Sequence, residues 1–135
     1  INVAWTKDRI QYFPETEKKP VSVTYDFADT ADSLYAPEYL ETKNQYGFFL
    51  NDNHAFIEIH TGYNPGKTLF VIKDSYANCF VPFLTQSYSK VVVVDLRSMP
   101  KGLAELIHSE KIEEILVLYS FENLASDSNF PRLLY

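Results

Sequence analysis

The 135-residue chain is acidic overall, because 12 Lys and Arg residues stand against 18 Asp and Glu residues and give a formal net charge of −6. Beyond Lys18 and Lys19 it has no cluster of basic residues, so it lacks the basic face that binds nucleic acid, and no nucleic-acid partner is expected. No apolar run approaches the roughly 20 residues of a membrane-spanning helix. The length and the 46% hydrophobic content suit a single domain with its own core.

Cofactor and metal chemistry leave no signature in the sequence. No His, Cys or Asp residues have a recognisable ligand spacing, and four glycines offer no phosphate-binding loop. We therefore expect no metal and no cofactor. The one cysteine, Cys79, excludes an internal disulfide, and its apolar surroundings predict a core position. Because residue 1 is Ile rather than Met, we expect the natural chain to continue upstream.

The first half of the chain predicts alternating strands and turns. Residues 1–19 are expected to lead into the domain. Alternation of apolar and polar residues predicts half-buried strands over 21–27 and 56–60. Residues 37–40 suit one short helical turn, and the run of turn-forming residues at 51–54 predicts a turn before the second strand.

The second half has longer apolar runs, which are typical of parallel strands buried on both faces. These runs cover residues 69–72, 91–94 and 115–119, and helical stretches at 76–88 and 103–110 separate them. Pro82 should kink or shorten the first of these helices. The alternation predicts an α/β fold whose core at 68–119 holds three parallel strands and two right-handed crossovers.

Polar residues follow each of these three strands, at the edge where open parallel sheets bind ligands. They are Asp74 and Ser75, then 95–98 with Asp95 and Arg97, then 120–123. Their convergence would make a plausible site. Polar residues are also expected wherever strand ends meet solvent, so the pattern fits both interpretations.

Ser75 is the candidate nucleophile, because it stands directly after a buried strand and at the start of a helical stretch. The free N–H groups and the dipole of a helix N-terminus can stabilise an oxyanion, and several serine hydrolases hold their nucleophile this way. An Asp-Ser pair at a helix start is also an ordinary N-cap.

An activated serine needs a base, and the chain has three histidines. His108 suits a solvated helix end, and His60 suits a structural role at a strand end. His54 has the most site-like setting, in the 51–54 turn. The neighbouring Asn53 could donate its amide to an oxyanion, or it could simply tolerate a left-handed turn.

Several blocks of the sequence resemble the bacterial DHHW family, in the same order along the chain and over roughly residues 20–127. The most specific is Lys73-Asp74-Ser75-Tyr76-Ala77-Asn78. The others are Asp32-Ser33-Leu34-Tyr35, Tyr46-Gly47-Phe48-Phe49-Leu50, Asn53-His54, Val94-Asp95-Leu96-Arg97 and Ile115-Leu116-Val117-Leu118-Tyr119.

The resemblance implies similarity to SGNH hydrolases and to alginate O-acetyltransferases. It implies a three-layer α/β sandwich with a largely parallel sheet, SGNH-hydrolase-like (flavodoxin-like), of which residues 1–135 form one domain, the C-terminal part. It also implies that Ser75 is the nucleophile and that the base belongs to an upstream Asp-His-His-Trp motif. This chain lacks that motif, since no histidine precedes His54, and Asn51-Asp52 stands where the family usually has Gly-Gly.

On that resemblance the chain is expected to be a piece of a polysaccharide esterase or O-acyltransferase that is inactive alone. Oxyanion or substrate-binding roles fall to Asn53, His54, Asp74, Asn78, Asp95 and Arg97. The partner would be a polysaccharide or acylated sugar, and the location extracellular or in the envelope of a Gram-positive bacterium. His54 as the base and a non-catalytic carbohydrate-binding or scaffolding module on the same fold remain alternatives.

Overall fold

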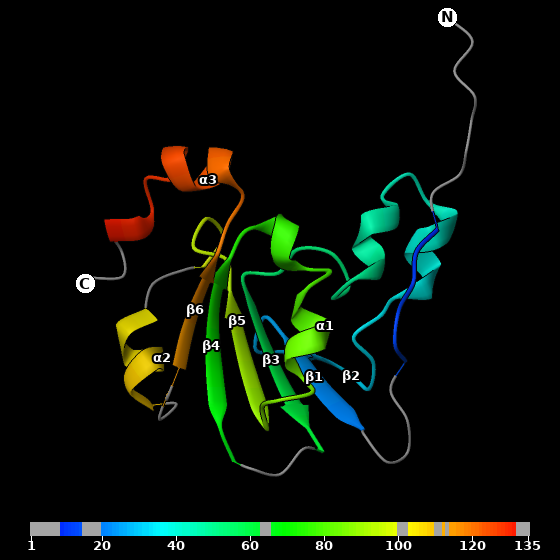
Figure 1. Ribbon diagram of the computed structural model, residues 1–135, viewed down its shortest axis with the longest axis horizontal. Coiled ribbons are helices and arrows are strands. Elements are labelled where there is room, and N and C mark those ends of the chain that lie inside the picture. The colour runs from blue at the N-terminus through cyan, green and yellow to red at the C-terminus, as the bar shows by residue number, and fades with distance from the viewer. Residues whose placement is uncertain are drawn as a thin grey trace, which may run out of the picture.

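A six-stranded mixed sheet organises the chain in a computed structural model, which describes residues 9–14, 20–62, 66–99, 103–109, 112 and 114–131 (Figure 1). The strands are β1 (Val21–Tyr25), β2 (Asp29–Ala31), β3 (Phe56–Thr61), β4 (Thr68–Lys73), β5 (Lys90–Val94) and β6 (Glu114–Leu118). The α-helices are α1 (Val81–Leu84), α2 (Leu103–Ser109) and α3 (Phe121–Ser126). Three short 3₁₀ helices are η1 (Pro37–Glu41), η2 (Gln45–Phe48) and η3 (Ser75–Ala77).

The strand order across the sheet is β2-β1-β3-β5-β4-β6. Strand β4 lies between β5 and β6 and is parallel to both, which confirms the α/β fold and the three parallel strands. The other three pairings are antiparallel, so the prediction of a largely parallel sheet is wrong. Only a short loop joins β3 to β4, and a parallel arrangement of those strands would need a much longer crossover.

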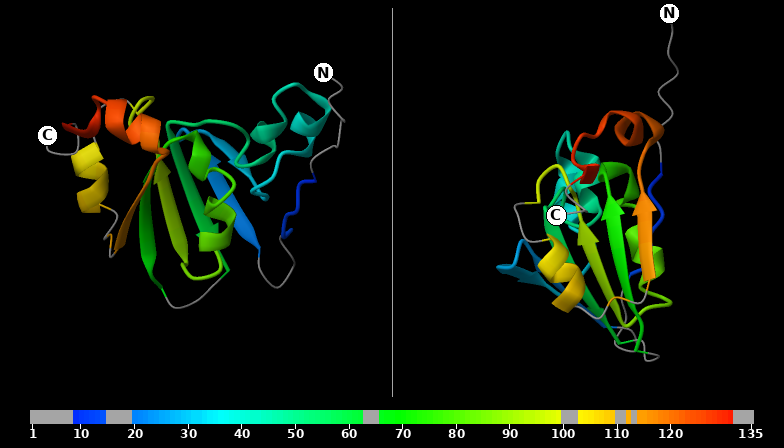
Figure 2. Two further views of the ribbon diagram at one scale, coloured as in Figure 1. Left: turned by 45° about the horizontal axis from the view of Figure 1, so that its top comes forward. Right: turned by 90° about the vertical axis from the view of Figure 1, so that its left-hand side faces the viewer.

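Each face of the parallel part is covered by one short helix (Figure 2). On one face, α1 packs through Val81 into a core formed by residues of β4 and β5, namely Leu69, Val71, Val91 and Val93. On the other face the alternate residues of the same strands pack against α2. The apolar runs of β4 and β5 are therefore buried on both sides, as the sequence predicted. The run of β6 is not, because β6 is an edge strand in which Ile115 and Val117 are exposed. The helical layers are also thinner than those of the three-layer sandwich that the resemblance implied.

The helix predicted over 76–88 is broken into two short pieces. It starts as η3, passes through a turn at 78–80, and resumes as α1 with Pro82 in its first turn. Proline is tolerated there because the first N–H groups of a helix have no partner within it. Cys79 lies in the intervening turn and is partly exposed, so its predicted core position is wrong. The helix predicted at 103–110 is confirmed as α2 over Leu103–Ser109, and residue 110 lies outside the described residues.

Strand β1 ends at Tyr25 rather than at residue 27, because the chain turns sharply into β2. Asp26 and Phe27 both have positive φ, of 47° and 64°, which suits a tight hairpin turn. The Phe27 ring stacks on Phe56 with centroids 4.0 Å apart. That contact, along with the Ala28 N–H bond to the Tyr25 carbonyl at 3.0 Å, holds the turn.

Much of the aromatic content packs beside the sheet, where η1, η2 and residues 9–14 lie together (Figure 1). Tyr12 makes edge contacts with Tyr35 and Phe48, at 5.0 and 5.2 Å between ring centroids. These contacts fasten the 9–14 segment to η2. Within the described residues, no helix is both long and apolar enough to span a membrane.

Candidate functional site

Ser75 begins η3 at the carboxyl end of β4, and its side chain is partly exposed. Its hydroxyl makes no hydrogen bond to any residue that the structure describes. The η3 helix is only three residues long, so it provides little of the dipole that the predicted longer helix would have provided. The Asp74 carboxylate accepts a hydrogen bond from the Tyr76 N–H at 3.0 Å, and the Asp74 carbonyl accepts one from the Ala77 N–H at 3.2 Å. The Ser75 N–H is then the backbone donor nearest the hydroxyl.

Asp74 anchors this turn to the segment that follows β6. Its fully buried carboxylate accepts hydrogen bonds from the Ser120 N–H at 2.9 Å, the Ser120 hydroxyl at 2.7 Å and Asn123 Nδ2 at 2.7 Å. Burial opposes its charge, but the hydrogen bonds from Asn123, Ser120 and Tyr76 outweigh burial and hold the pKa of Asp74 below its usual value. Two of the predicted polar strand tips thus meet through Asp74.

Asn78 links the Ser75 turn to Asn53. The Asn78 N–H donates to the Ser75 carbonyl at 3.2 Å, and its buried side chain donates through Nδ2 to Asn53 Oδ1 and to the Asp52 carbonyl, each at 3.3 Å. Asn53 itself is exposed, and its Nδ2 contacts Asp52 Oδ1 at 3.2 Å. The structure therefore connects Ser75, Asn78 and Asn53, three of the predicted site residues.

The turn before Asn53 is left-handed over three consecutive residues. Leu50, Asn51 and Asp52 have φ values of 58°, 54° and 74°. Asn and Asp are among the non-glycine residues that best tolerate this region, which explains how Asn51-Asp52 can stand in place of Gly-Gly. Asp52 is held further by the bond from its N–H to the Gly47 carbonyl at 3.0 Å and by Asn44 Nδ2 at 2.8 Å.

His54 braces the β1–β2 hairpin. Its Nδ1 lies 2.7 Å from Asp26 Oδ2, and its Nε2 lies 2.8 Å from the Asn51 carbonyl oxygen. Both partners are acceptors, so only a doubly protonated ring satisfies both bonds. Burial alone would raise the pKa of Asp26. The hydrogen bonds from His54 and the Phe56 N–H outweigh burial and hold that pKa below its usual value. To act as a base, His54 would have to give up one of these bonds.

Asp95 and Arg97 pair with each other at the tip of β5. The Arg97 guanidinium donates through Nε to Asp95 Oδ1 at 2.9 Å and through Nη2 to Asp95 Oδ2 at 2.6 Å. The backbone N–H of Arg97 also donates to Asp95 Oδ1, at 3.0 Å. The hydrogen bonds that Arg97 donates to the Asp95 carboxylate raise the pKa of Arg97. The carboxylate is buried and the guanidinium is partly exposed, so Arg97 is the member of the pair that a ligand could reach.

Sequence reasoning missed two residues that support the site. Lys73, directly before Asp74, is fully buried at the end of β4. Tyr46 donates its hydroxyl to the Tyr76 carbonyl at 3.1 Å and accepts the Cys79 N–H at 3.3 Å, which fastens the Ser75 turn to η2. Both residues stand within family-like blocks of the sequence, and Lys73 also ends an apolar run, but neither signal pointed to a role at the site. Among the described residues, no group of three or more His, Cys, Asp or Glu could hold a metal ion.

Solved structures of similar fold include a DHHW family protein from Eubacterium siraeum DSM 15702, with a TM-score of 0.72 and 19% identity over 90% of this chain. Bacillus cereus PatB1 is also similar, at 25% identity and a TM-score of 0.65, and so is PatB1 with a sulfonyl adduct, at 28% identity and 0.66, each over 82% of this chain. No family model matches the sequence, and no curated protein shows significant similarity to it.

These similarities confirm the resemblance to DHHW family proteins that the sequence predicted. The chain spans 41% of the length of the DHHW structure and 38% of each PatB1 structure. It therefore corresponds to less than half of the proteins it resembles.

Proposed function

We propose that this chain is the nucleophile-bearing part of a cell-surface, SGNH-like serine esterase or O-acyltransferase that acts on acylated polysaccharide. The observation that carries the proposal is Ser75: its hydroxyl is free of hydrogen bonds to the described residues, on a turn that Asp74 anchors to β6 and Asn78 ties to Asn53. Rigid support of a reactive group on fixed elements is what a catalytic site needs.

In this reaction Ser75 Oγ attacks the acyl carbon of an ester, and its proton passes to a base. The Ser75 N–H and Asn53 Nδ2 are the donors available to the oxyanion. The alcohol leaves with the proton, and the acyl group stays on Ser75. Water then releases it in an esterase, or a sugar hydroxyl takes it in a transferase.

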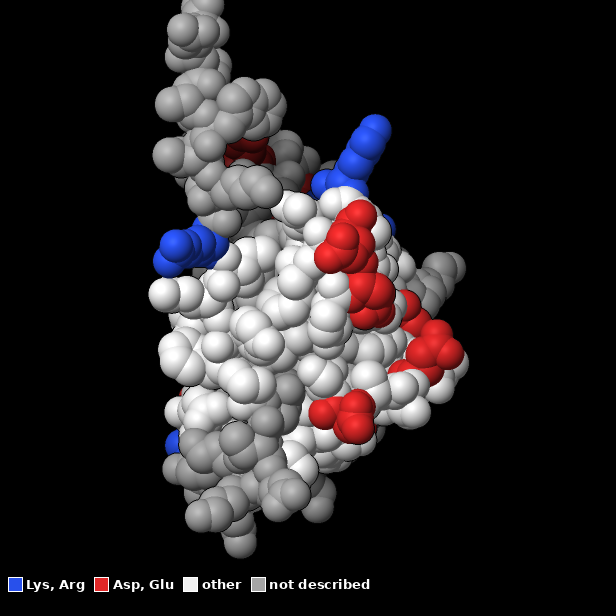
Figure 3. All heavy atoms as spheres, turned by 90° about the vertical axis from the view of Figure 1, so that its right-hand side faces the viewer, with Lys and Arg blue, Asp and Glu red and all other residues white. Residues whose placement is uncertain are grey.

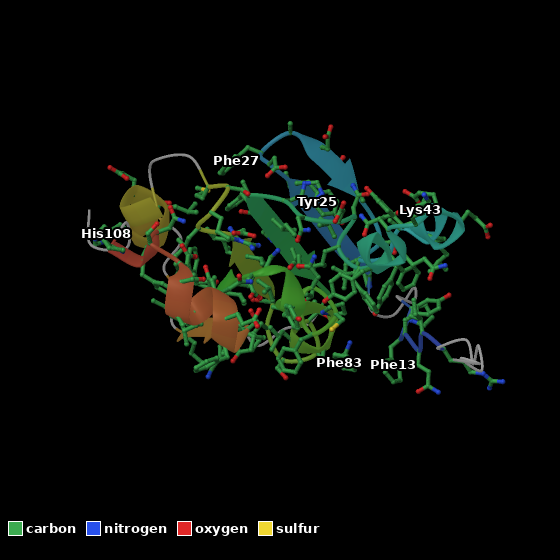
Figure 4. All side chains as sticks on the ribbon, turned by 90° about the horizontal axis from the view of Figure 1, so that it is seen from above. Phe13, Tyr25, Phe27, Lys43, Phe83 and His108 are labelled. Carbon is green, nitrogen blue, oxygen red and sulfur yellow. The ribbon has the colours of Figure 1, made fainter. Side chains whose placement is uncertain are left out.

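The base is not supplied by any histidine placed at the site. His54 is engaged by Asp26 and Asn51, while His60 pairs with Glu58 at 2.7 Å, and His108 lies near the exposed end of α2 (Figure 4). We therefore propose that the base belongs to a further segment of the whole protein, as the Asp-x-His pair of the resembled family implies.

The PatB1 structure with a sulfonyl adduct supports a nucleophile in this fold, because sulfonyl groups attach to proteins through nucleophilic side chains. The electrostatics favour a ligand without many negative charges. Figure 3 shows acidic side chains gathered in a band on one side of the molecule, and the chain carries a net charge of −6.

The test is to treat the chain with a fluorophosphonate and to map any adduct by mass spectrometry, with and without imidazole as an added base. The proposal predicts an adduct on Ser75 that imidazole accelerates and that Ser75→Ala abolishes. Ser98→Ala, at another exposed strand tip, is the matched control and should label as the wild type does. Absence of an adduct on Ser75 under all conditions would contradict the proposal.

A non-catalytic carbohydrate-binding module is the second candidate, favoured by exposed aromatic rings beside Ser75. Tyr76, Phe80 and Phe83 are 72%, 45% and 52% exposed, and Phe13 packs on Phe83 with centroids 5.7 Å apart (Figure 4). No charged residue occurs between Asp74 and Lys90, so this surface suits a neutral sugar chain.

Binding of chitohexaose, followed by calorimetry, separates the two candidates. A module would bind it with Ser75→Ala unchanged and Phe83→Ala weakened, and no fluorophosphonate adduct would form. Phe121→Ala, which removes a ring 85% exposed on α3, is the control.

A further inference from the structure

The loop that presents Asn53 is closed by the side chain of the next residue. Leu50, Asn51 and Asp52 all have positive φ, and such a run of left-handed residues persists only where its surroundings hold it. The Asn51 carbonyl oxygen lies 2.8 Å from His54 Nε2, and among the described residues His54 is its only donor. Asn53 therefore stands inside a loop whose two ends are joined by His54.

The other ring nitrogen of His54 fastens this loop to the turn between β1 and β2. Nδ1 lies 2.7 Å from Oδ2 of Asp26, whose Oδ1 accepts the Phe56 N–H at 3.0 Å. The Tyr25 ring packs on the imidazole with centroids 4.4 Å apart, and the His54 side chain is only 16% exposed. The imidazole thus joins two turns that lie 28 residues apart in the sequence.

Both bonds of His54 require a proton on the imidazole nitrogen, because a carboxylate oxygen and a carbonyl oxygen can only accept. A neutral imidazole has a single N–H. That N–H would go to Asp26, since hydrogen bonds to a charged acceptor are the stronger ones. Nε2 would then direct its lone pair at the Asn51 carbonyl oxygen. Loss of one proton therefore releases the Asn51 end of the link and leaves the Asp26 end bound.

The protonation of His54 is set against one contacting charge. Among the described residues that charge is Asp26, while Asp52 directs its carboxylate at two asparagine amides and Glu58 of β3 is paired with a lysine and another histidine. Tyr25 contributes a ring contact. Burial opposes the charge of Asp26, but the hydrogen bonds it accepts outweigh burial and hold its pKa below the usual value. The carboxylate therefore stays charged where an ordinary histidine titrates.

We propose that His54 is a positioning residue: its doubly protonated imidazole ties the Asn51 carbonyl to Asp26 and so holds the loop that presents Asn53, and loss of one proton opens this link. The Asn53 amide is then held most firmly at mildly acidic pH. The assignment of that amide to an oxyanion rests on the proposed function. The link through His54 does not.

A ¹⁵N NMR titration of the protein between about pH 5 and pH 9, the range in which histidine ordinarily changes charge, tests the link. At the low end both ring nitrogens of His54 should carry a proton. As the pH rises, Nε2 should lose its proton and Nδ1 should keep it, and the side-chain amide signal of Asn53 should shift over the same range. Three results would overturn the proposal: a single ring proton at the low end, two at the high end, or an Asn53 signal that stays fixed while the ring loses a proton.

Asp26→Asn should remove the pH dependence without breaking the bond to Asn51. Asparagine tolerates the positive φ of 47° at this position. The Phe56 N–H should hold the new amide oxygen, so that the amide nitrogen faces His54. A neutral imidazole then accepts at Nδ1 and donates from Nε2 to the Asn51 carbonyl. We expect the proton of neutral His54 on Nε2 and an Asn53 signal that no longer shifts with pH. A shift as large as that of the wild type would contradict the proposal.

His54→Phe keeps an aromatic ring beside Tyr25 but removes both donors, so its Asn53 signal should resemble that of the wild type at high pH throughout the titration. His60→Phe, which removes the imidazole bound to Glu58, is the matched control and should keep the wild-type shift of Asn53. If His54→Phe does not fold, the ring spectrum and Asp26→Asn decide. None of these readouts needs catalysis, so an inert Ser75 would refute the proposed function without affecting this inference.

Discussion

Asp74 shows how a residue chosen from the sequence for chemistry can serve the structure around it. Its carboxylate accepts hydrogen bonds from the Tyr76 N–H, from both polar groups of Ser120 and from Asn123. Every one of these partners is a donor, so the carboxylate must be ionised to satisfy them all. Its neighbour Ser75 keeps a hydroxyl that no described residue binds.

Asp74→Asn should lower the free energy of unfolding by about 2–4 kcal/mol. The buried donors would lose their charged acceptor, and the new amide nitrogen, itself a donor, would face some of them. The pKa of Asp74 is lowered in the folded protein, so its stabilisation is present above its ordinary pKa of 3.8 and is lost as the pH falls through the folded value. Urea unfolding between pH 7 and pH 2 measures both effects.

The variant should show a smaller loss of stability on acidification than the wild type. Ser120→Ala, which removes one of the donors but keeps the carboxylate, is the matched control and should retain most of the pH dependence. An Asp74→Asn variant that loses as much stability in acid as the wild type would contradict this account.

The sequence could name Ser75, Asn53 and Asn78, because their types and their place in a family-like block carry the signal. It could not show that His54 bonds Asp26, 28 residues away, or that Lys73 and Asn78 are both fully buried. Those facts depend on how distant segments pack, and a histidine in a turn has the same sequence whether or not its nitrogens are occupied.

At the scale of elements, η2 and η1 approach each other closely at Gly47. A Cβ at this position would overlap the ring of Tyr39, and the Gly47 carbonyl also receives the Asp52 N–H. Glycine is thus required here for close packing, and through Asp52 it supports the turn that presents Asn53.

Gly47→Ala should cost about 1–3 kcal/mol of unfolding free energy, since the ring must move to admit the methyl group. Thermal unfolding measures the change. Gly47→Ala combined with Tyr39→Ala should recover part of the loss, because the clashing ring is gone. A single variant as stable as the wild type would show that the two helices have room to adjust.

The strands β4 and β5 were predictable because their apolar runs are buried on both faces of the sheet, as with Leu69 and Phe70 on opposite sides of β4. The run of β6 also marked a strand, although it lies at the edge of the sheet and Ile115 and Val117 are exposed. The helix at 76–88 was not, since its apolar residues suit either a helix or a broken turn. Tyr46 binds the Tyr76 carbonyl and the Cys79 N–H, which fixes the break. The antiparallel half also escaped prediction, because alternation reveals a strand but not its direction.

At the scale of the whole molecule, the chain matches less than half of the length of the DHHW protein and of PatB1. The described part holds a supported serine, two candidate oxyanion donors and no unoccupied histidine beside them. This combination explains why the proposal assigns the nucleophile to this chain and the base to another segment of the protein.

The most direct measurement of that claim is the acetylation of the chain by p-nitrophenyl acetate, followed by peptide mapping. We predict an acetyl group on Ser75, formed faster when imidazole supplies the missing base, and none in Ser75→Ala. Acetylation that is equally fast without imidazole would show that the base lies within the chain, and no acetyl group on Ser75 in either condition would contradict its role as the nucleophile.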